Sequence, residues 1–150
     1  MFSTVILPWI HYVAIVTLSG AIFAKLYLMK LPASSDIVRL LPRIDRLEGI
    51  SAVIVFVTGL ARVWHGAKPA EFYWQNGLFH GVVGLFVLAA LLSLIPTVRF
   101  MRWKRALEAD GTLPDALALR KTRVFSHVMA TVVVAIALMI TLVAKGYGAH

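Results

Sequence analysis

Apolar residues dominate long stretches of the chain, and polar residues gather between them. The stretch from Phe72 to Val98 contains 27 residues without an Asp, Glu, Lys or Arg. As a helix rising about 1.5 Å per residue it is about 40 Å long, enough to cross a hydrocarbon layer about 30 Å thick. Met1 to Ala24 and Val124 to Ala144 are also free of formal charge. Each of these stretches predicts a transmembrane helix.

The second span is the weakest by hydropathy. Only 13 residues, Gly49 to Ala61, separate Glu48 from Arg62. They cover about 20 Å as a helix, less than the hydrocarbon thickness, so Glu48 or Arg62 must reach the interface or face the protein interior. We expect a helix from about residue 43 to 64, preceded by a short interfacial helix that ends at Pro42.

Together these segments predict an all-α fold with a single domain, residues 1–150. The spans are expected at about residues 5–29, 43–64, 73–98 and 121–144. Turn signals occur at 66–69 and 107–114, and Asp115 is the expected cap of a helix that continues into the fourth span. Short connections make neighbouring helices antiparallel. We therefore expect an integral membrane four-helix bundle with up-down-up-down topology.

The composition agrees with a membrane domain. The chain is 60% hydrophobic and 15% charged, whereas soluble domains are about 45–50% apolar and about 25% charged. The absence of cysteine excludes disulfides, thiolate catalysis and Cys-ligated metal centres. The sequence has no Gly-rich phosphate loop, Gly-x-Ser-x-Gly elbow or His-Glu-x-x-His motif, which argues against a hydrolase or a nucleotide-binding enzyme. No enzyme class is assigned.

Basic residues give the chain a net charge of +8 and lie at the ends of the apolar segments. This pattern is typical of topology signals and of anchors to anionic lipid headgroups, not of nucleic-acid binding. The first and third loops hold 4 and 7 Lys or Arg residues, 11 together, and the second loop and the C-terminus hold 2 and 1, 3 together. Since the more basic loops stay in the cytoplasm, both termini are expected outside it.

Two histidines at similar depth suggest a haem site. His11 lies early in span one and His80 early in span three, and these spans are diagonal in a four-helix bundle. Their imidazoles would bind the iron of haem b from both sides, with space left by Gly77, Gly81 and Gly84. The alternative is that these glycines permit close helix packing and that each histidine hydrogen-bonds a neighbouring helix.

A second polar cluster is expected at the cytoplasmic level of the bundle, formed by Lys25, Glu48 and His127. In a structural role, Glu48 pairs with Lys25 or Arg123, which makes the short second span tolerable. In a functional role, the cluster is a proton relay or an anion pocket, because Glu, His and Lys in one membrane cavity exchange protons near neutral pH.

The sequence resembles an uncharacterised bacterial family of four-span predicted membrane proteins, domain of unknown function 2214. The resemblance covers nearly the whole chain and implies a multi-pass protein of the bacterial inner membrane. It rests on His11 followed by Gly20, on the segments Arg46-Leu47-Glu48-Gly49 and Thr58-Gly59-Leu60-Ala61-Arg62-Val63, and on Phe79-His80 followed by residues 91–100.

More distantly, the chain is similar to four-helix membrane protoporphyrinogen oxidases and to copper-resistance membrane domains. The similarity rests on His11-Tyr12-Val13, Ser19-Gly20 and the segment 123–127. In those oxidases a histidine on span one and the lysine of a His-x-Lys motif on span three are implicated in haem binding. Here the motif reads His80-Gly81-Val82, so the lysine is missing. The resemblance therefore implies a tetrapyrrole role for His11 and does not imply the oxidase activity.

Two functional hypotheses follow. In the first, the protein binds haem b or another tetrapyrrole and has a redox role, with His11 and His80 as iron ligands. In the second, it has no cofactor and acts as an accessory or scaffold subunit or as a small-solute pathway. Helix contacts with a second copy or another membrane protein would then form through Gly77, Gly81 and Gly84. In both, the lipid bilayer is a partner and nucleic acid is not.

Overall fold

The computed structural model describes residues 2–66 and 68–148, and the regular elements in this part of the chain are all helices. The all-α prediction is confirmed. In chain order the elements are the π-helical turn η1 (Phe2–Ile6), α1 (Leu7–Leu28), α2 (Ser35–His65), α3 (Ala70–Trp74), α4 (Gly77–Asp110) and α5 (Ala116–Ala144).

Long apolar helices make up most of the molecule. By length and composition, Thr4–Leu28, Ser35–His65, Gly77–Asp110 and Ala116–Ala144 can each cross a membrane. Many large apolar side chains on these helices point outward, among them Val16, Leu91, Val134 and Leu138. Such a surface is unfavourable in water and suits contact with lipid chains.

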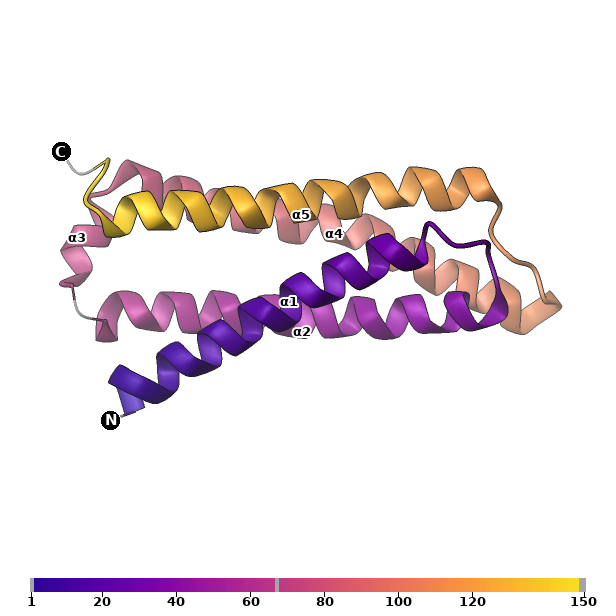
Figure 1. Cartoon of the computed structure of the whole chain (residues 1–150), viewed down its shortest axis with the longest axis horizontal. Helices are drawn as coiled ribbons and strands as arrows, with labels where there is room; N and C mark the ends of the chain where they lie inside the picture. Colours follow the sequence, from indigo (N-terminus) through magenta and orange to yellow (C-terminus); the bar gives the residue numbers. More distant parts are fainter. Residues whose placement is uncertain (1, 67, 149–150) are drawn as a thin grey trace.

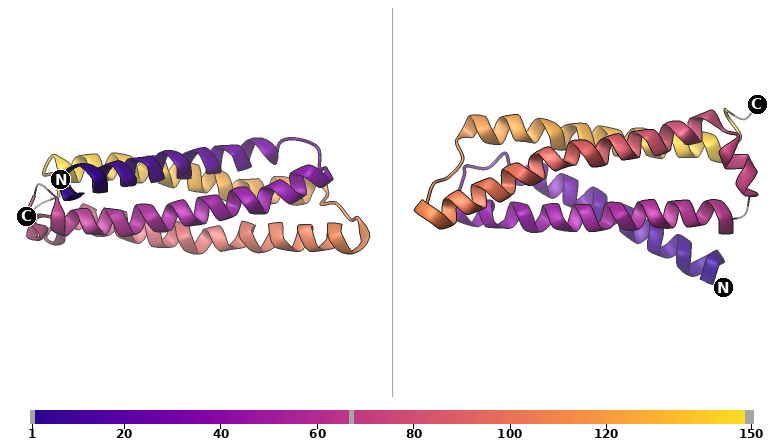
Figure 2. Two further views of the ribbon diagram at one scale, coloured as in Figure 1. Left: turned by 90° about the horizontal axis from the view of Figure 1, so that it is seen from below. Right: turned by 180° about the vertical axis from the view of Figure 1, so that it is seen from behind.

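The four long helices form an antiparallel bundle (Figure 1). α1 packs on α2 and α5, and α4 packs on α2 and α5, so α1 and α4 occupy diagonal positions. Both chain ends lie at one end of the bundle, together with α3 (Figures 1 and 2). We call this the termini end. The α1–α2 and α4–α5 connections lie at the opposite end, the loop end. The up-down-up-down topology is confirmed.

Three apolar clusters fill the bundle along its length. The first includes Leu18, Ile22, Leu26 and Met129. The second, towards the loop end, is built on Met29, Leu41, Phe100 and Leu119. The third, at the termini end, is built on Val63, Phe79 and Val143. Lys25 precedes Leu26 and lies near the ring of Phe100, so the buried charge described below sits between the first two clusters.

α2 begins earlier than expected and passes through Pro42 without a break. The prediction of a separate interfacial helix that ends at Pro42 is therefore wrong. Proline removes one backbone donor and crowds the carbonyl four residues earlier, but a helix held by its neighbours can accommodate that loss. The helix start is fixed by Ser34, whose hydroxyl accepts a hydrogen bond from the Ile37 amide at 3.3 Å.

The charge-free stretch from Phe72 to Val98 is not one helix. α3 ends at Trp74, and α4 begins at Gly77 and runs on to Asp110, well beyond Val98. Asn76 makes the break because its side-chain oxygen accepts from the amides of Leu78 and Phe79, which caps α4. Hydropathy alone does not register this cap, since Gln75 and Asn76 carry no charge. The residue that follows the last turn of α4 is Gly111, whose φ of 77° suits glycine.

The cap predicted for the fourth span is confirmed. The Asp115 carboxylate accepts from the Ala118 amide at 2.6 Å, and α5 continues from Ala116 to Ala144 without interruption. Towards the termini end the chain closes back on α4, where the Asn76 side-chain amide donates to the Tyr147 carbonyl at 2.8 Å.

Candidate functional site

A buried lysine between two carboxylates is the main polar feature of the bundle interior. The Lys25 ammonium nitrogen lies 2.6 Å from Oδ1 of Asp45 and 2.7 Å from Oε2 of Glu48. Lys25 is 1% exposed, Asp45 8% and Glu48 5%. Asp45 and Glu48 are three residues apart on α2, so both face α1. We call these residues the Lys25 cluster.

The Lys25 cluster joins three helices. The Thr97 hydroxyl of α4 lies 2.6 Å from the second carboxylate oxygen of Asp45, Oδ2, and 2.9 Å from the Ser93 carbonyl, and the shorter of these two hydrogen bonds is the one to Asp45. The ring of Phe100, also on α4, has its centroid 5.6 Å from the Lys25 nitrogen. Asp45 thus receives both an ammonium and a hydroxyl group, whereas Glu48 is paired with the ammonium alone.

The charges in this cluster do not balance. Two carboxylates face one ammonium, and no further ion pair to Asp45 or Glu48 occurs within residues 2–66 and 68–148. A buried net negative charge is costly in a low-dielectric interior. A metal cation is disfavoured as the missing charge because the Lys25 ammonium would repel it. A proton on one of the carboxyl groups restores balance.

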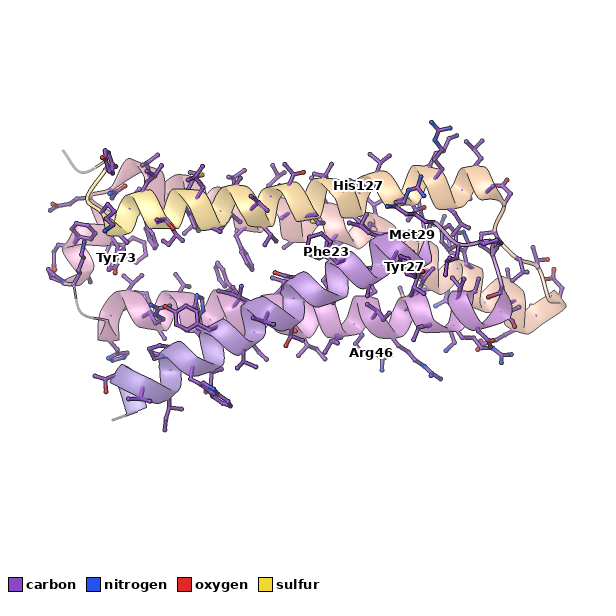
Figure 3. All side chains as sticks on the ribbon, viewed as in Figure 1. Phe23, Tyr27, Met29, Arg46, Tyr73 and His127 are labelled. Atoms are coloured by element: carbon purple, nitrogen blue, oxygen red, sulfur yellow. The ribbon has the colours of Figure 1, made fainter. Side chains whose placement is uncertain are left out.

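The structure brings together two of the three residues expected at this level. Lys25 pairs with Glu48, as the structural alternative predicts. Arg123 does not pair with them. Its guanidinium instead lies 3.5 Å from the Met29 carbonyl. His127 is exposed, and its carbonyl accepts the Thr131 hydroxyl. Figure 3 shows His127 on α5 in the same half of the bundle as Met29.

Thr97 was not expected at this site from the sequence, and Asp45 was expected at the level of Lys25 and Glu48 but not as a member of their cluster. Asp45 had a usable signal, because it precedes Glu48 by three residues and the two therefore share a helix face. Thr97 had none. Its role depends on how α4 packs against α2, and that packing is not encoded in local spacing.

His11 faces α2 rather than the centre of the bundle. Its Nδ1 lies 2.8 Å from the Thr58 hydroxyl oxygen, and that hydroxyl lies 2.5 Å from the Ile54 carbonyl. Because a carbonyl only accepts, the Thr58 hydrogen goes to Ile54, and His11 donates from Nδ1. The other ring nitrogen, Nε2, is then the basic one. Gly59 makes room for the ring, since a β-carbon there would lie 3.3 Å from His11 Cε1.

His80 has different surroundings. It is exposed, and its Nε2 donates to the Trp74 carbonyl at 2.9 Å. The neighbouring rings are those of Trp74 and Phe79. Figure 3 shows Tyr73, from the same short helix as Trp74, at the termini end of the bundle.

The two histidines as placed do not form one bis-histidine site. His11 is held against Thr58 of α2, and His80 is turned to the backbone of Trp74. Each histidine thus hydrogen-bonds a neighbouring segment, as the alternative to haem ligation predicts. Within the described residues, no group of three or more His, Cys, Asp or Glu side chains is arranged to hold a metal ion. In this arrangement the Nδ1 of His11 and the Nε2 of His80 are each engaged in a hydrogen bond within the chain.

The three glycines expected to form one contact surface face different surroundings. A β-carbon at Gly81 would lie 2.8 Å from the terminal methyl of Met139, so Gly81 packs on α5 within the chain. A β-carbon at Gly77 or Gly84 would meet nothing within 4 Å. Only these two are open to an external partner.

An antiparallel bundle of four apolar helices around a buried ionic cluster defines a small multi-pass helical membrane protein. The chain belongs to the family of predicted membrane proteins DUF2214, whose sequence model matches residues 3–148. The main resemblance in the sequence is thereby confirmed. No curated protein and no solved structure shows significant similarity to the chain. The comparisons do not support the more distant resemblance to protoporphyrinogen oxidases and copper-resistance domains.

Proposed function

We propose that the protein transfers protons through the membrane along the interface between α1 and α2. The observation that carries this proposal is a row of buried polar side chains on the face of α2 that meets α1. The row consists of Asp45, Glu48, Ser51 and Thr58. Their spacing of 3, 3 and 7 residues places each member next to the following one on the helix surface, so the row turns gradually around α2.

Both ends of this row hold groups that exchange protons. The Lys25 cluster lies towards the loop end, and Thr58 carries the hydrogen-bonded His11 ring towards the termini end. Asp45 and Thr58 are 13 positions apart, which is about 20 Å along a helix. Ionisable residues at membrane depth are costly, and they commonly mark proton or ion pathways. A histidine ring can both accept and donate a proton, which suits the entry position.

Glu48 is the proton-carrying group in this proposal. Asp45 is the better stabilised anion, since it receives both Lys25 and Thr97, whereas Glu48 shares only the ammonium. A proton that neutralises the cluster therefore resides on Glu48. When this proton leaves Glu48, the cluster has a net negative charge, and that charge attracts the next proton.

A purely structural role for the Lys25 cluster makes a different prediction. Ion pairs that only tie α1, α2 and α4 together stabilise the bundle without moving protons. The accessory or scaffold hypothesis shares this expectation. Proton flux and stability must therefore be measured on the same variants.

The test uses purified protein in liposomes that contain a pH-sensitive dye, with a membrane potential set by a potassium gradient and valinomycin. Wild type should change the internal pH faster than empty liposomes do. Glu48→Gln and His11→Gln should lower the flux by on the order of tenfold or more, because each removes a positioned proton carrier. Exposed residues supply matched controls, Glu71→Gln and His65→Gln. Wild-type flux equal to that of empty liposomes, or full flux in Glu48→Gln, would overturn the proposal.

Orientation and compartment are part of the proposal. The bacterial inner membrane follows from the bacterial family resemblance. The loop end is assigned to the cytoplasm because its connections carry most of the basic residues, and both termini lie together at the other end (Figure 2). The proton row then runs from His11 on the outer side to the Lys25 cluster on the cytoplasmic side.

Binding of haem b or another tetrapyrrole stays a prediction from the sequence. One observation favours His11 as a ligand: the Thr58 contact fixes its ring through Nδ1 and leaves Nε2 basic. The test is the visible spectrum of protein purified from cells supplied with a haem precursor, before and after reduction with dithionite. A stoichiometric Soret band that is lost in His11→Ala would support it, and a colourless folded protein would exclude it.

A further inference from the structure

A basic cavity is lined by residues of the last turns of α4 and the first turns of α5. These two helices are connected at the loop end (Figure 1). The cavity is a shallow pocket, open to the surface, with a volume of about 320 Å³. Arg99, Arg102 and Lys121 supply three cationic side chains to its lining.

The cationic groups of this cavity are not neutralised by acidic partners. Arg99 donates to the Thr122 hydroxyl at 3.1 Å and lies over the Phe125 ring, both of which are uncharged. Neither Arg102 nor Lys121 forms an ion pair within residues 2–66 and 68–148. Three cations around one cavity repel one another, and an anion bound between them relieves that repulsion.

One acidic side chain also lines the cavity. Asp115 accepts the Ala118 amide at 2.6 Å and caps α5, so its carboxylate is already engaged with the helix start. The lining still carries three positive charges against one negative charge. This balance selects an anion, and arginine favours a phosphate group because its planar donors match the phosphate oxygens.

The depth of the cavity points to the headgroup layer of the membrane. Arg99 directly follows the apolar segment that ends at Val98, and Val124 opens the next apolar segment. Val98 and Val124 are exposed, so apolar surface adjoins the basic cavity on the membrane side. Trp103, another lining residue, suits the interface because its ring is apolar and its N–H is polar. If the phosphate of a lipid headgroup occupied the cavity, the acyl chains of that lipid would lie beside this apolar surface.

We propose that this cavity binds a phosphate-bearing anion, and that the headgroup of an anionic phospholipid is its occupant in the membrane. Arg102 and Lys121 hold the phosphate, and Arg99, fixed by Thr122 and Phe125, forms the back of the site. The site is independent of the proton row, because none of the residues of that row lines the cavity.

The test compares two double variants with the same loss of charge. Arg102→Gln with Lys121→Gln removes the two exposed cations of the cavity. Arg105→Gln with Arg120→Gln removes two exposed cations of the same polar region that do not line it. Native mass spectrometry of the detergent-solubilised protein then measures binding of phosphatidylglycerol and of the zwitterionic phosphatidylcholine.

Wild type should bind phosphatidylglycerol in preference to phosphatidylcholine. The cavity variant should lose affinity for phosphatidylglycerol by roughly 25-fold, about fivefold for each basic side chain near the anionic lipid. The control variant should stay within about twofold of wild type, since distant exposed charges are screened by salt. Far-UV circular dichroism and gel filtration check that both variants are folded.

Inorganic phosphate distinguishes the two sources of the ligand. The same detergent-solubilised proteins are titrated with phosphate in a calorimeter. If wild type binds phosphate and the cavity variant does not, the cavity is assigned to a free anion. Phosphatidylglycerol binding without phosphate binding assigns it to the lipid headgroup. Equal losses in the cavity and control variants would overturn the proposal. So would a wild-type protein that neither prefers phosphatidylglycerol to phosphatidylcholine nor binds inorganic phosphate.

Discussion

The ammonium of Lys25 on α1 lies 2.7 Å from Oε2 of Glu48 on α2, and it is shared with Asp45 on the same helix face. This sharing makes the two carboxyl groups unequal. Asp45 also accepts the Thr97 hydroxyl and is the natural counter-ion of the lysine. Glu48 is the group that can gain or lose a proton without leaving the lysine unpaired.

This inequality predicts different effects of two similar substitutions. Asp45→Asn should destabilise the folded protein by about 3–5 kcal/mol, because it removes the main counter-ion of a buried ammonium. Glu48→Gln should cost less than about 1 kcal/mol if Glu48 carries the proton as we propose, since a neutral side chain of the same shape then replaces a neutral carboxyl group. Detergent-induced unfolding followed by circular dichroism measures both, with Glu71→Gln as the exposed control. Equal losses would mean that Glu48 is an anion.

A triple substitution separates the structural contribution of the Lys25 cluster from its function. Lys25→Met alone should destabilise the bundle strongly, by about 3–5 kcal/mol, because two carboxyl groups stay buried without a cation. Adding Asp45→Asn and Glu48→Gln should restore much of the stability, since no buried charge then remains. The same triple variant should lack proton flux in liposomes. A stable triple variant with normal flux would place the pathway elsewhere in the bundle.

The order of the helices could be predicted from the sequence because it depends on local hydropathy. The need of Glu48 for a basic partner could also be predicted, whereas the choice of Lys25 over Arg123 depends on how the helices pack. Charge-free length predicts a span, and a glutamate that interrupts a short apolar segment must find a partner. The failures have a different physical basis. Asn76 ends α3 and caps α4 through a hydrogen-bonded side chain, which hydropathy does not record. His80 was expected to face the bundle centre, but that depends on the rotation of α4 about its axis.

Asn76 is predicted to stabilise the termini end through two separate contacts. Its side-chain oxygen caps α4, and its amide group donates to the Tyr147 carbonyl. Asn76→Ala should cost about 1–2 kcal/mol or more, because it removes the cap and leaves the carbonyl without this donor. Asn76→Asp keeps the cap and should lose less. Thermal unfolding in detergent measures the order, and Asn76→Asp as damaging as Asn76→Ala would show that the contact with Tyr147 dominates.

The proposed orientation can be tested without background labelling because the chain contains no cysteine. Glu71→Cys on α3 should react with a membrane-impermeant maleimide in intact cells, once the outer membrane is permeable to the reagent. Thr112→Cys in the α4–α5 connection should react only after lysis. Both positions are exposed, so accessibility of the thiol to solvent does not bias the comparison. The reverse pattern would place the loop end outside the cytoplasm.

Gly81 and Gly84 are predicted to respond differently to a bulky side chain, although both lie on α4. A β-carbon at Gly81 would lie 2.8 Å from the terminal methyl of Met139, whereas one at Gly84 would have open space. Gly81→Leu should therefore destabilise the monomer by about 1–3 kcal/mol through overpacking against α5. Met139→Ala should relieve part of that loss because it removes the crowded methyl group.

Gly84→Leu should leave the stability of the monomer nearly unchanged, since a β-carbon at this position meets nothing within 4 Å. It is thus the variant that tests whether α4 contacts a second copy or another membrane protein. Unfolding in detergent measures the stability of each variant, and native mass spectrometry measures its oligomeric state. A stable Gly84→Leu protein that has lost a wild-type oligomer would assign the open face of α4 to that contact. An unchanged oligomeric state would leave this face to the lipid.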